Sequence, residues 1–249
     1  MNHATGSTPH GLRIAVVTPC FQEPLAVLRR CVESVSQQSV QCSHFLVSDG
    51  DARSEVAALP VQHIALATTH HDCGDTPRLI GSVSAIAQGY DALLWLDADN
   101  WFEPDHVERM LEASVGVTVV TAARMLRRPD GSRLGVCTES DGNRFNDTNC
   151  YLLLRPAFHL ARYWGFKPVR DAVIGDRIVW EACVRRHERI GRNPVPTLNY
   201  TTHVAAHYLS RNEVPPSDAR VILREDDGYR SILYSEFLRS RQVGRVHTR

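Results

Sequence analysis

Apolar and polar residues alternate along the first half of the chain in blocks that predict strands and helices in turn. Three stretches have apolar residues at the three- and four-residue spacing of helices, namely 23–38, 76–90 and 103–114. Between them lie short, mainly apolar runs that end in polar residues, as buried strands do, at 13–21, 44–51, 61–68 and 91–100. This β-α-β-β-α-β-α order predicts a parallel sheet covered by helices on both faces. Thr76, with Pro77 after it, is the expected N-cap of the middle helix.

The second half of the pattern is less regular. A strand is expected at 116–126, a loop-rich segment at 127–149, and a second strand at 150–155. Helices are expected from Pro156 and over 176–187. The stretch 195–209 begins with β-branched residues and ends near two histidines. The tail, 213–249, predicts two short helices around Pro215 and Pro216.

Three of the predicted strands end in polar residues, at 18–20, 48–51 and 97–100. In an open parallel sheet these ends meet on one rim, where ligands bind. Asp97 and Asp99 are two residues apart on an extended segment, so their carboxylates face the same side. Carboxylate oxygens suit hard divalent cations. The alternative interpretation is a strand-to-helix turn whose aspartates accept hydrogen bonds from backbone amides.

Composition narrows the class of protein. The 249 residues can form one large domain, and a net charge of zero gives no electrostatic support for a nucleic-acid partner. The seven cysteines are odd in number and include no CxxC pair, which favours a reducing compartment over a disulfide framework or structural zinc site. No apolar signal-peptide core and no apolar run of ~20 residues occur. We therefore expect a cytoplasmic protein.

Four motifs in order resemble the family-2 glycosyltransferases of the GT-A fold. They are "VVTPCFQEP" (16–24), "SDGD" (48–51), "LDADN" (96–100) and "GDRIVW" (175–180), within a resemblance that covers roughly residues 12–208. The resemblance implies an α/β GT-A fold, with a mixed, mainly parallel sheet flanked by helices. We expect a disordered start at 1–11, a GT-A domain at 12–212, and a C-terminal helical extension at 213–249. Within the domain, 12–114 would bind nucleotide and 115–212 the acceptor.

The resemblance also implies an activity and roles for residues. It implies transfer of a sugar from a nucleotide-sugar donor, with a UDP-sugar favoured, to a hydroxyl acceptor, with Mn²⁺ or Mg²⁺ as cofactor. Asp99 would bind the metal, and Asp97 a ribose or a metal-bound water. The remaining donor contacts would come from Thr18, Pro19, Glu23, Asp49 or Asp51, and Arg78.

Asp176 is the expected general base, since an inverting transferase needs a carboxylate to take the acceptor's proton. The family often has Glu-Asp here, whereas this chain has Gly175 before Asp176. Asp171 and Asp147 are alternative bases, and an N-cap role for Asp176 is the structural alternative. A histidine after the last strand supplies a metal ligand in some GT-A enzymes, which favours His203 over His207.

Other classes fit the sequence less well. A haloacid-dehalogenase phosphatase needs DxDxT, and a Rossmann dehydrogenase needs GxGxxG after the first strand; neither is present. The first loop also lacks the Gly- and Arg-rich motif of nucleotidylyltransferases. A non-catalytic GT-A-like binding module stays open. The acceptor could be a glycan, a metabolite or a lipid-linked carrier. The Arg-rich tail could contact an anionic membrane surface at the inner face, or form a docked terminal helix.

Overall fold

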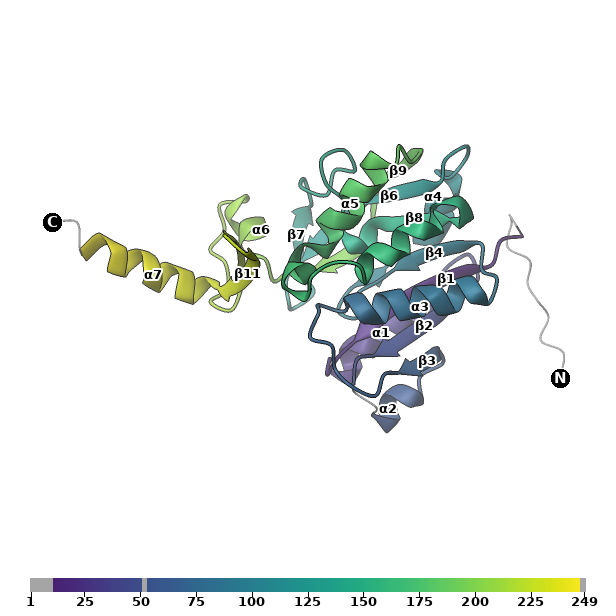
Figure 1. Cartoon of the computed structure of the whole chain (residues 1–249), viewed down its shortest axis with the longest axis horizontal. Coiled ribbons are helices and arrows are strands. Elements are labelled where there is room, and N and C mark those ends of the chain that lie inside the picture. Colours follow the sequence, from purple (N-terminus) through teal and green to yellow (C-terminus); the bar gives the residue numbers. More distant parts are fainter. Residues whose placement is uncertain (1–10, 51–52, 247–249) are drawn as a thin grey trace.

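One mixed sheet forms the centre of the protein (Figure 1). The computed structural model describes residues 11–50 and 53–246, so the expected disorder of the N-terminus lies almost entirely outside the described residues. The strand order is β3-β2-β1-β4-β8-β6-β9-β5, with β7 paired to β6. The strands are β1 (Ile14–Cys20), β2 (Cys42–Ser48), β3 (Gln62–Ala65), β4 (Ala92–Trp95), β5 (Trp101–Phe102), β6 (Val119–Arg127), β7 (Arg133–Val136), β8 (Tyr151–Leu154) and β9 (Ile190–Thr201).

The first four strands, β1 to β4, pair in parallel, as the apolar runs predict. Antiparallel strand β8 joins this half to β6, and β6 pairs in parallel with β9. The sheet is therefore mixed and flanked by helices, which confirms the predicted fold class. Alternate residues of each strand supply two separate cores, because successive side chains point to opposite faces. Ala15 and Val17 lie in one core, and Ile14 and Val16 in the other.

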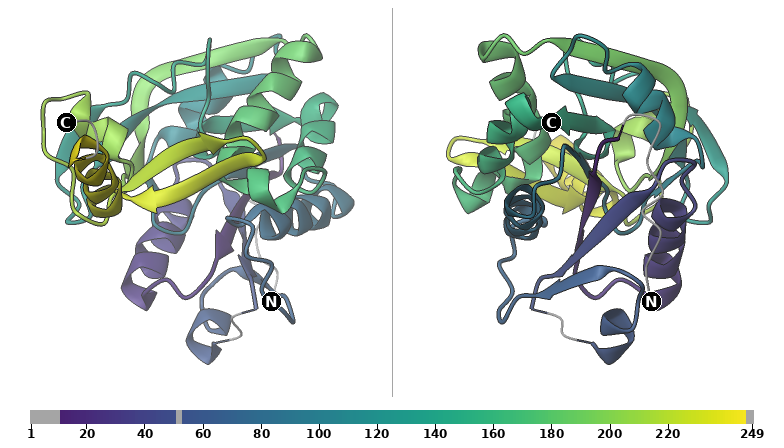
Figure 2. Two further views of the ribbon diagram at one scale, coloured as in Figure 1. Left: turned by 60° about the vertical axis from the view of Figure 1, so that its left-hand side comes forward. Right: turned by 90° about the vertical axis from the view of Figure 1, so that its right-hand side faces the viewer.

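Helices cover both faces of the sheet (Figure 2). On one face lie α3 (Asp75–Ala87), the 3₁₀ segment η2 (Arg155–Trp164) and α5 (Gly175–Arg185). On the other lie α1 (Leu25–Ser36) and α4 (His106–Glu112). The short elements are α2 (Ser54–Ala57), η1 (Thr148–Cys150), η3 (Val169–Ile174) and α6 (Ala205–Leu209). No helix in the described part of the chain is long and apolar enough to cross a membrane.

Gly81 allows α3 to lie close to the parallel strands. A Cβ atom at this position would be 2.5 Å from Val17 Cγ1 and 3.0 Å from Val47 Cγ2. The absence of a side chain thus brings the helix against β1 and β2, and places its N-terminus beside the strand ends.

Two predicted helices differ in detail from those observed. Helix α3 begins at Asp75, with left-handed Gly74 as its N-cap, so Thr76 is not the cap. The Asp72 side chain instead accepts hydrogen bonds from the Thr76 amide and hydroxyl, at 2.9 and 2.6 Å. The segment from Pro156 is 3₁₀ rather than α-helical.

The prediction of two short helices in the tail was wrong in its first part. The tail forms a hairpin of β10 (Arg220–Glu225) and β11 (Gly228–Leu233), followed by one helix, α7 (Tyr234–Val246). Residues 226–227 form the two-residue loop, next to Gly228 at a φ of 146°. Burial alternates over the first four residues of β10, as in a strand that packs on one face. Helix α7 extends outward from the hairpin (Figure 1).

Candidate active site

The ends of β1, β2 and β4 form one rim of a cleft. Because these strands are parallel neighbours, their carboxyl ends meet on the same side of the sheet. A cavity of about 560 Å³ at this rim is lined by six predicted site residues, namely Pro19, Glu23, Asp49, Arg78, Asp97 and Asp99. Thr18 is not among the lining residues; it is fully buried, and its Oγ1 lies 2.8 Å from His44 Nε2. Asp51 lies outside the described residues.

Asp49 lines the cavity with both carboxylate oxygens already in contact with His70. The His70 amide lies 3.2 and 3.1 Å from the two oxygens, and the ring Nδ1 lies 2.6 Å from Oδ1. Asp49 is therefore held as a turn residue at the end of β2, and a nucleotide would have to share its oxygens with His70 or displace that side chain.

Asp97 is fixed from two sides. Arg78 Nη2 donates to Asp97 Oδ1 at 2.5 Å, and Asn149 Nδ2 donates to Oδ2 at 2.9 Å. The Asp97 amide donates to Asn149 Oδ1 at 2.5 Å. Arg78 is buried and also forms an ion pair with Asp75 at 3.5 Å. Arg78 therefore orients the Asp97 carboxylate. It also lines the cavity, as expected of a residue that contacts the donor.

Asp99 has its backbone anchored and its carboxylate open. The Asp99 carbonyl accepts from Arg30 Nη2 at 2.9 Å and from Thr201 Oγ1 at 2.6 Å. Burial, followed by the neighbouring Asp97 and Glu23 carboxylates, raises the pKa of Asp99 to about 7. Burial also raises the pKa of Glu23. Three carboxylates thus share a cavity in which their mutual repulsion would be relieved by a cation.

His203 is the histidine that faces this group. Its Nε2 lies 3.9 Å from Asp99 Oδ2, and both side chains are partly exposed. His207 is buried elsewhere, with Nδ1 2.6 Å from Thr202 Oγ1 and Nε2 3.4 Å from Glu139 Oε2. Two ligands of one octahedral cation lie about 3 Å apart when each bond is about 2.1 Å, so a small side-chain movement would let Asp99 and His203 bind the same ion.

Asp99 and His203 fit a divalent cation whose coordination shell is completed by the substrate. No group of three or more metal-ligating side chains occurs in the described part of the chain. Mg²⁺-type sites commonly use one or two carboxylates and take their remaining ligands from phosphate and water. Asp99 and His203 would therefore hold a cation that also contacts a diphosphate.

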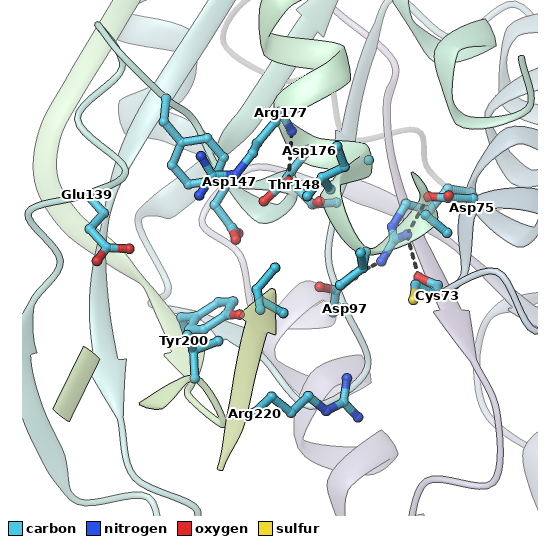
Figure 3. A pocket seen from close by; sticks show the side chains of 18 of the residues that line it. Cys73, Asp75, Asp97, Glu139, Asp147, Thr148, Asp176, Arg177, Tyr200 and Arg220 are labelled. Atoms are coloured by element: carbon cyan, nitrogen blue, oxygen red, sulfur yellow. Dashed lines mark hydrogen bonds and ion pairs between the residues drawn. The ribbon is translucent and has the colours of Figure 1, made fainter. Parts of the chain in front are cut away.

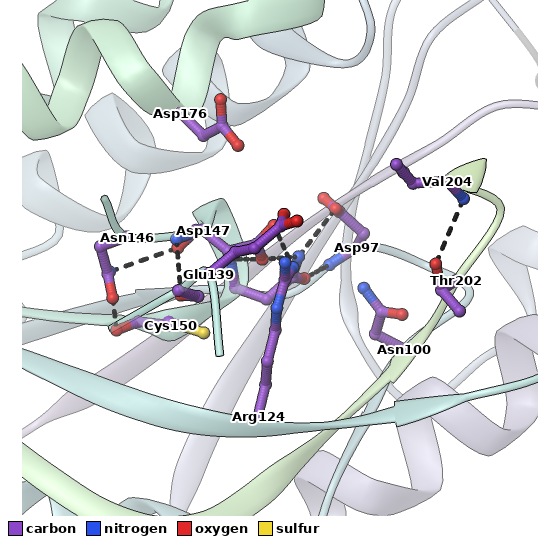
Figure 4. Close-up of polar contacts among 12 residues, drawn as sticks. Asp97, Asn100, Arg124, Glu139, Asn146, Asp147, Cys150, Asp176, Thr202 and Val204 are labelled. Carbon is purple, nitrogen blue, oxygen red and sulfur yellow. Dashed lines mark hydrogen bonds and ion pairs between the residues drawn. The ribbon is translucent and has the colours of Figure 1, made fainter. Parts of the chain in front are cut away.

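Asp176 lies across the opening from Asp97 (Figure 3). Both residues line an adjoining cavity of about 280 Å³. Asp176 is the second residue of α5, and its Oδ1 accepts a hydrogen bond from the Arg177 amide at 2.7 Å. The N-cap position is Ile174, so Asp176 does not occupy it. Its carboxylate faces the open space (Figure 4).

Burial, and then the nearby Asp147 carboxylate, raises the pKa of Asp176 to about 7. A carboxylate with this pKa is suited to accept a proton near neutral pH. Asp147 is less available, since Arg124 Nη1 lies 2.5 Å from its Oδ2 and Asn149 Nδ2 donates to its Oδ1 at 2.9 Å. Asp171 is not among the residues that line the cavity.

A buried polar network behind the cleft was missed in the sequence. Asn149 joins Asp97 to Asp147, and Asp147 pairs with the buried Arg124. The Arg124 guanidinium lies 4.0 Å over the Tyr200 ring. A charged residue within the apolar run 119–126 was the available signal for Arg124. Asn149 carried no comparable signal, because its contact with Asp97 spans 52 residues of sequence.

The fold is similar to that of solved glycosyltransferase structures. A structure of Staphylococcus aureus TarS residues 1–349 in complex with UDP matches with a TM-score of 0.58 and 12% sequence identity, over 80% of this chain and 63% of that chain. A longer TarS structure matches with a TM-score of 0.56 and 12% identity, over 80% and 38% of the two chains. TarS is a GT-A glycosyltransferase. At this identity the likeness shows the fold, and this chain spans less than two thirds of either TarS chain. No protein-family model and no curated protein matches the sequence.

Proposed function

We propose that this protein is a metal-dependent glycosyltransferase that moves a sugar from a nucleotide-sugar donor to a hydroxyl acceptor. The observation that carries the proposal is the placement of Asp97 and Asp99 just after β4, with Asp176 across the opening from Asp97 in the adjoining cavity. The GT-A-like fold and the UDP in the TarS complex support a UDP-sugar as the donor. Residues 12–114 would contribute most donor contacts, and residues 115–212 most acceptor contacts.

The proposed roles follow from what each side chain can do. Asp99 and His203 would hold Mn²⁺ or Mg²⁺, which offsets negative charge on a leaving diphosphate when bound. Asp97, oriented by Arg78 and Asn149, would contact the ribose or a water of that ion. Pro19, Glu23 and Asp49 line the same cavity and would contact the nucleotide.

Asp176 would act as the general base in a single displacement. The acceptor hydroxyl gives its proton to Asp176 as its oxygen forms a bond to the anomeric carbon. The bond between that carbon and the diphosphate breaks, and the nucleoside diphosphate leaves. Attack from the face opposite the leaving group inverts the anomeric configuration.

The first experiment is a thermal-shift panel with UDP, GDP, dTDP and CMP, each with Mn²⁺ and with excess chelator. We expect the largest stabilisation with UDP and Mn²⁺. UDP release from a panel of UDP-sugars then separates a transferase from the alternative, a non-catalytic GT-A-like module. Metal-dependent UDP binding with no turnover of any donor, in the presence of hydroxyl acceptors, would favour the module.

A further inference from the structure

The acceptor side of the cleft continues into a groove with an apolar lining. This groove has a volume of about 750 Å³ and lies where α6, the hairpin and the first turn of α7 meet. Leu209 and Ile222 are 51% and 40% exposed, so they present apolar surface to solvent rather than to the core. The larger apolar and aromatic side chains of the lining include Phe145, Val204, Leu209, Ile222, Tyr234 and Phe237.

Arginines stand between this groove and the proposed base. Arg177 and Arg220 line both the groove and the cavity that contains Asp176. They enter the opening from opposite sides (Figure 3). Neither side chain forms an ion pair with a carboxylate of the described residues, although the Arg177 guanidinium lies 5.0 Å over the Phe145 ring. Arg144, paired with Asp141 at 3.0 Å, adds a third cation at the groove.

The order of these features defines an acceptor. A carboxylate that takes a hydroxyl proton is followed by unpaired guanidinium groups, which bind phosphate well, and then by an exposed apolar trough. A sugar that carries a phosphate or diphosphate and then a hydrocarbon chain has the same order of groups. Arg220 also lines the nucleotide cavity, whereas Arg177 does not, so a neutral glycan would leave Arg177 and the apolar surface without partners.

Resting on the proposed function, we infer that the acceptor is a lipid-linked saccharide phosphate. Its reacting hydroxyl would lie at Asp176, its phosphate between Arg177 and Arg220, and the first part of its hydrocarbon chain along Leu209 and Ile222. The hairpin and α7 supply one wall of this groove, which gives the C-terminal extension a part in acceptor recognition.

The test uses farnesyl phosphate below its critical micelle concentration, with the full-length protein and with UDP and Mn²⁺ present. We expect saturable binding by isothermal titration calorimetry, and at least tenfold weaker binding of farnesol, which has the same chain without the phosphate. Leu209→Asp and Arg177→Gln should each weaken farnesyl phosphate binding by roughly tenfold, since a hydrophobic contact or a phosphate contact is lost. UDP affinity should stay within about twofold for Leu209→Asp, because Leu209 lines the groove and does not line the nucleotide cavity.

Two matched variants control for added or lost charge. Val214 is 85% exposed and outside the groove, so Val214→Asp should bind farnesyl phosphate as wild type does. Arg185→Gln removes a cation from the same helix as Arg177, away from the groove, and should also be silent. UDP binding without farnesyl phosphate binding would overturn the inference and leave the proposed function standing. Equal effects of the groove and control variants would also overturn it. Farnesyl phosphate binding without UDP binding would instead count against the proposed donor site.

Discussion

Asp176 differs from the other acids of the cleft in what its side chain contacts. Asp97 is held by Arg78 and Asn149, and Asp147 by Arg124, whereas Asp176 accepts one backbone hydrogen bond from Arg177. We expect Asp176→Asn to lower turnover by roughly 10²–10⁴, the usual contribution of a general base. The asparagine oxygen can keep the bond to the Arg177 amide, so fold and donor binding should persist. Initial rates and melting temperatures of both proteins test this.

Asp171→Asn is the control, since Asp171 precedes the same helix without lining the cavity.

The stability of the Asp176→Asn variant gives an independent check. The pKa of Asp176 is raised from 3.8 to about 7 in the folded protein, so its contribution to stability is fully present below about pH 3.8 and is lost as pH rises through 7. Asp176→Asn removes the cost of ionising the buried acid and should melt no lower than wild type at pH 8. A near-wild-type rate for this variant would return Asp176 to a structural role.

The same pKa predicts the acid limb of the rate profile. The base must be ionised, so kcat/KM should rise with pH and level off above about 7, where Asp176 has lost its proton. The measurement is kcat/KM at fixed ionic strength between about pH 5.5 and 8.5, with metal and donor saturating. An identical acid limb in the residual activity of Asp176→Asn would assign the limb to another group.

At the scale of the elements, the contact between α3 and the sheet depends on Gly81. Gly81→Val would place a side chain against Val17 and Val47 in a filled core. We expect a loss of roughly 1–3 kcal/mol in the free energy of unfolding, as overpacked cores show. Denaturant unfolding measures it. Ala87→Val introduces the same valine side chain at an exposed position of the same helix and should cost less than about 0.7 kcal/mol. A loss at Gly81 no larger than the loss at Ala87 would contradict the packing account, since valine is a better helix former than glycine.

The Arg124–Asp147 ion pair links β6 to the turn before η1 in the interior of the protein. Removing one partner leaves an unpaired buried charge, so Arg124→Met should destabilise the fold by about 3–5 kcal/mol. The double variant Arg124→Met with Asp147→Asn has no such charge, and its amide can still accept from Asn149. We expect it to recover at least half of the loss in urea unfolding. A double variant less stable than Arg124→Met would contradict this account.

The elements show where sequence reasoning succeeded and where it did not. The parallel half of the sheet was predicted from its continuous apolar runs. Asp97 and Asp99 were predicted to line the cleft because the end of a strand determines where the next residues lie. The tail hairpin was missed because its strands are half-exposed and its prolines drew attention to a turn rather than to the strands after it. Asn149 and Arg220 could not be assigned to the cleft from sequence, since their neighbours there come from distant segments. Arg124 was noticeable as a charged residue in an apolar run, but its partner Asp147 was not predictable.

At the scale of the whole molecule, a ligand that binds only the folded protein raises its stability. A ligand present at 100 times its Kd stabilises the folded state by about 2.7 kcal/mol. For a chain of this size that corresponds to a rise of roughly 5–10 °C in melting temperature. We expect this rise with UDP and Mn²⁺ together, and a much smaller one with UDP and chelator, because the carboxylates of Glu23, Asp97 and Asp99 would repel an uncompensated diphosphate.

Asp99→Asn separates the metal site from the nucleotide pocket. It removes the charge that would hold the cation beside His203 while keeping the side chain's size. The Mn²⁺-dependent part of the UDP shift should be lost, and the shift with UDP and chelator should be equal to or greater than that of wild type, since one repelling carboxylate is gone. Asp105→Asn changes a surface aspartate that pairs with Arg109 and should leave both shifts unchanged. If UDP raises the melting temperature of the wild-type protein equally in Mn²⁺ and in chelator, the proposed mechanism does not involve the cation. If Asp99→Asn keeps the full Mn²⁺-dependent shift, other residues bind the cation.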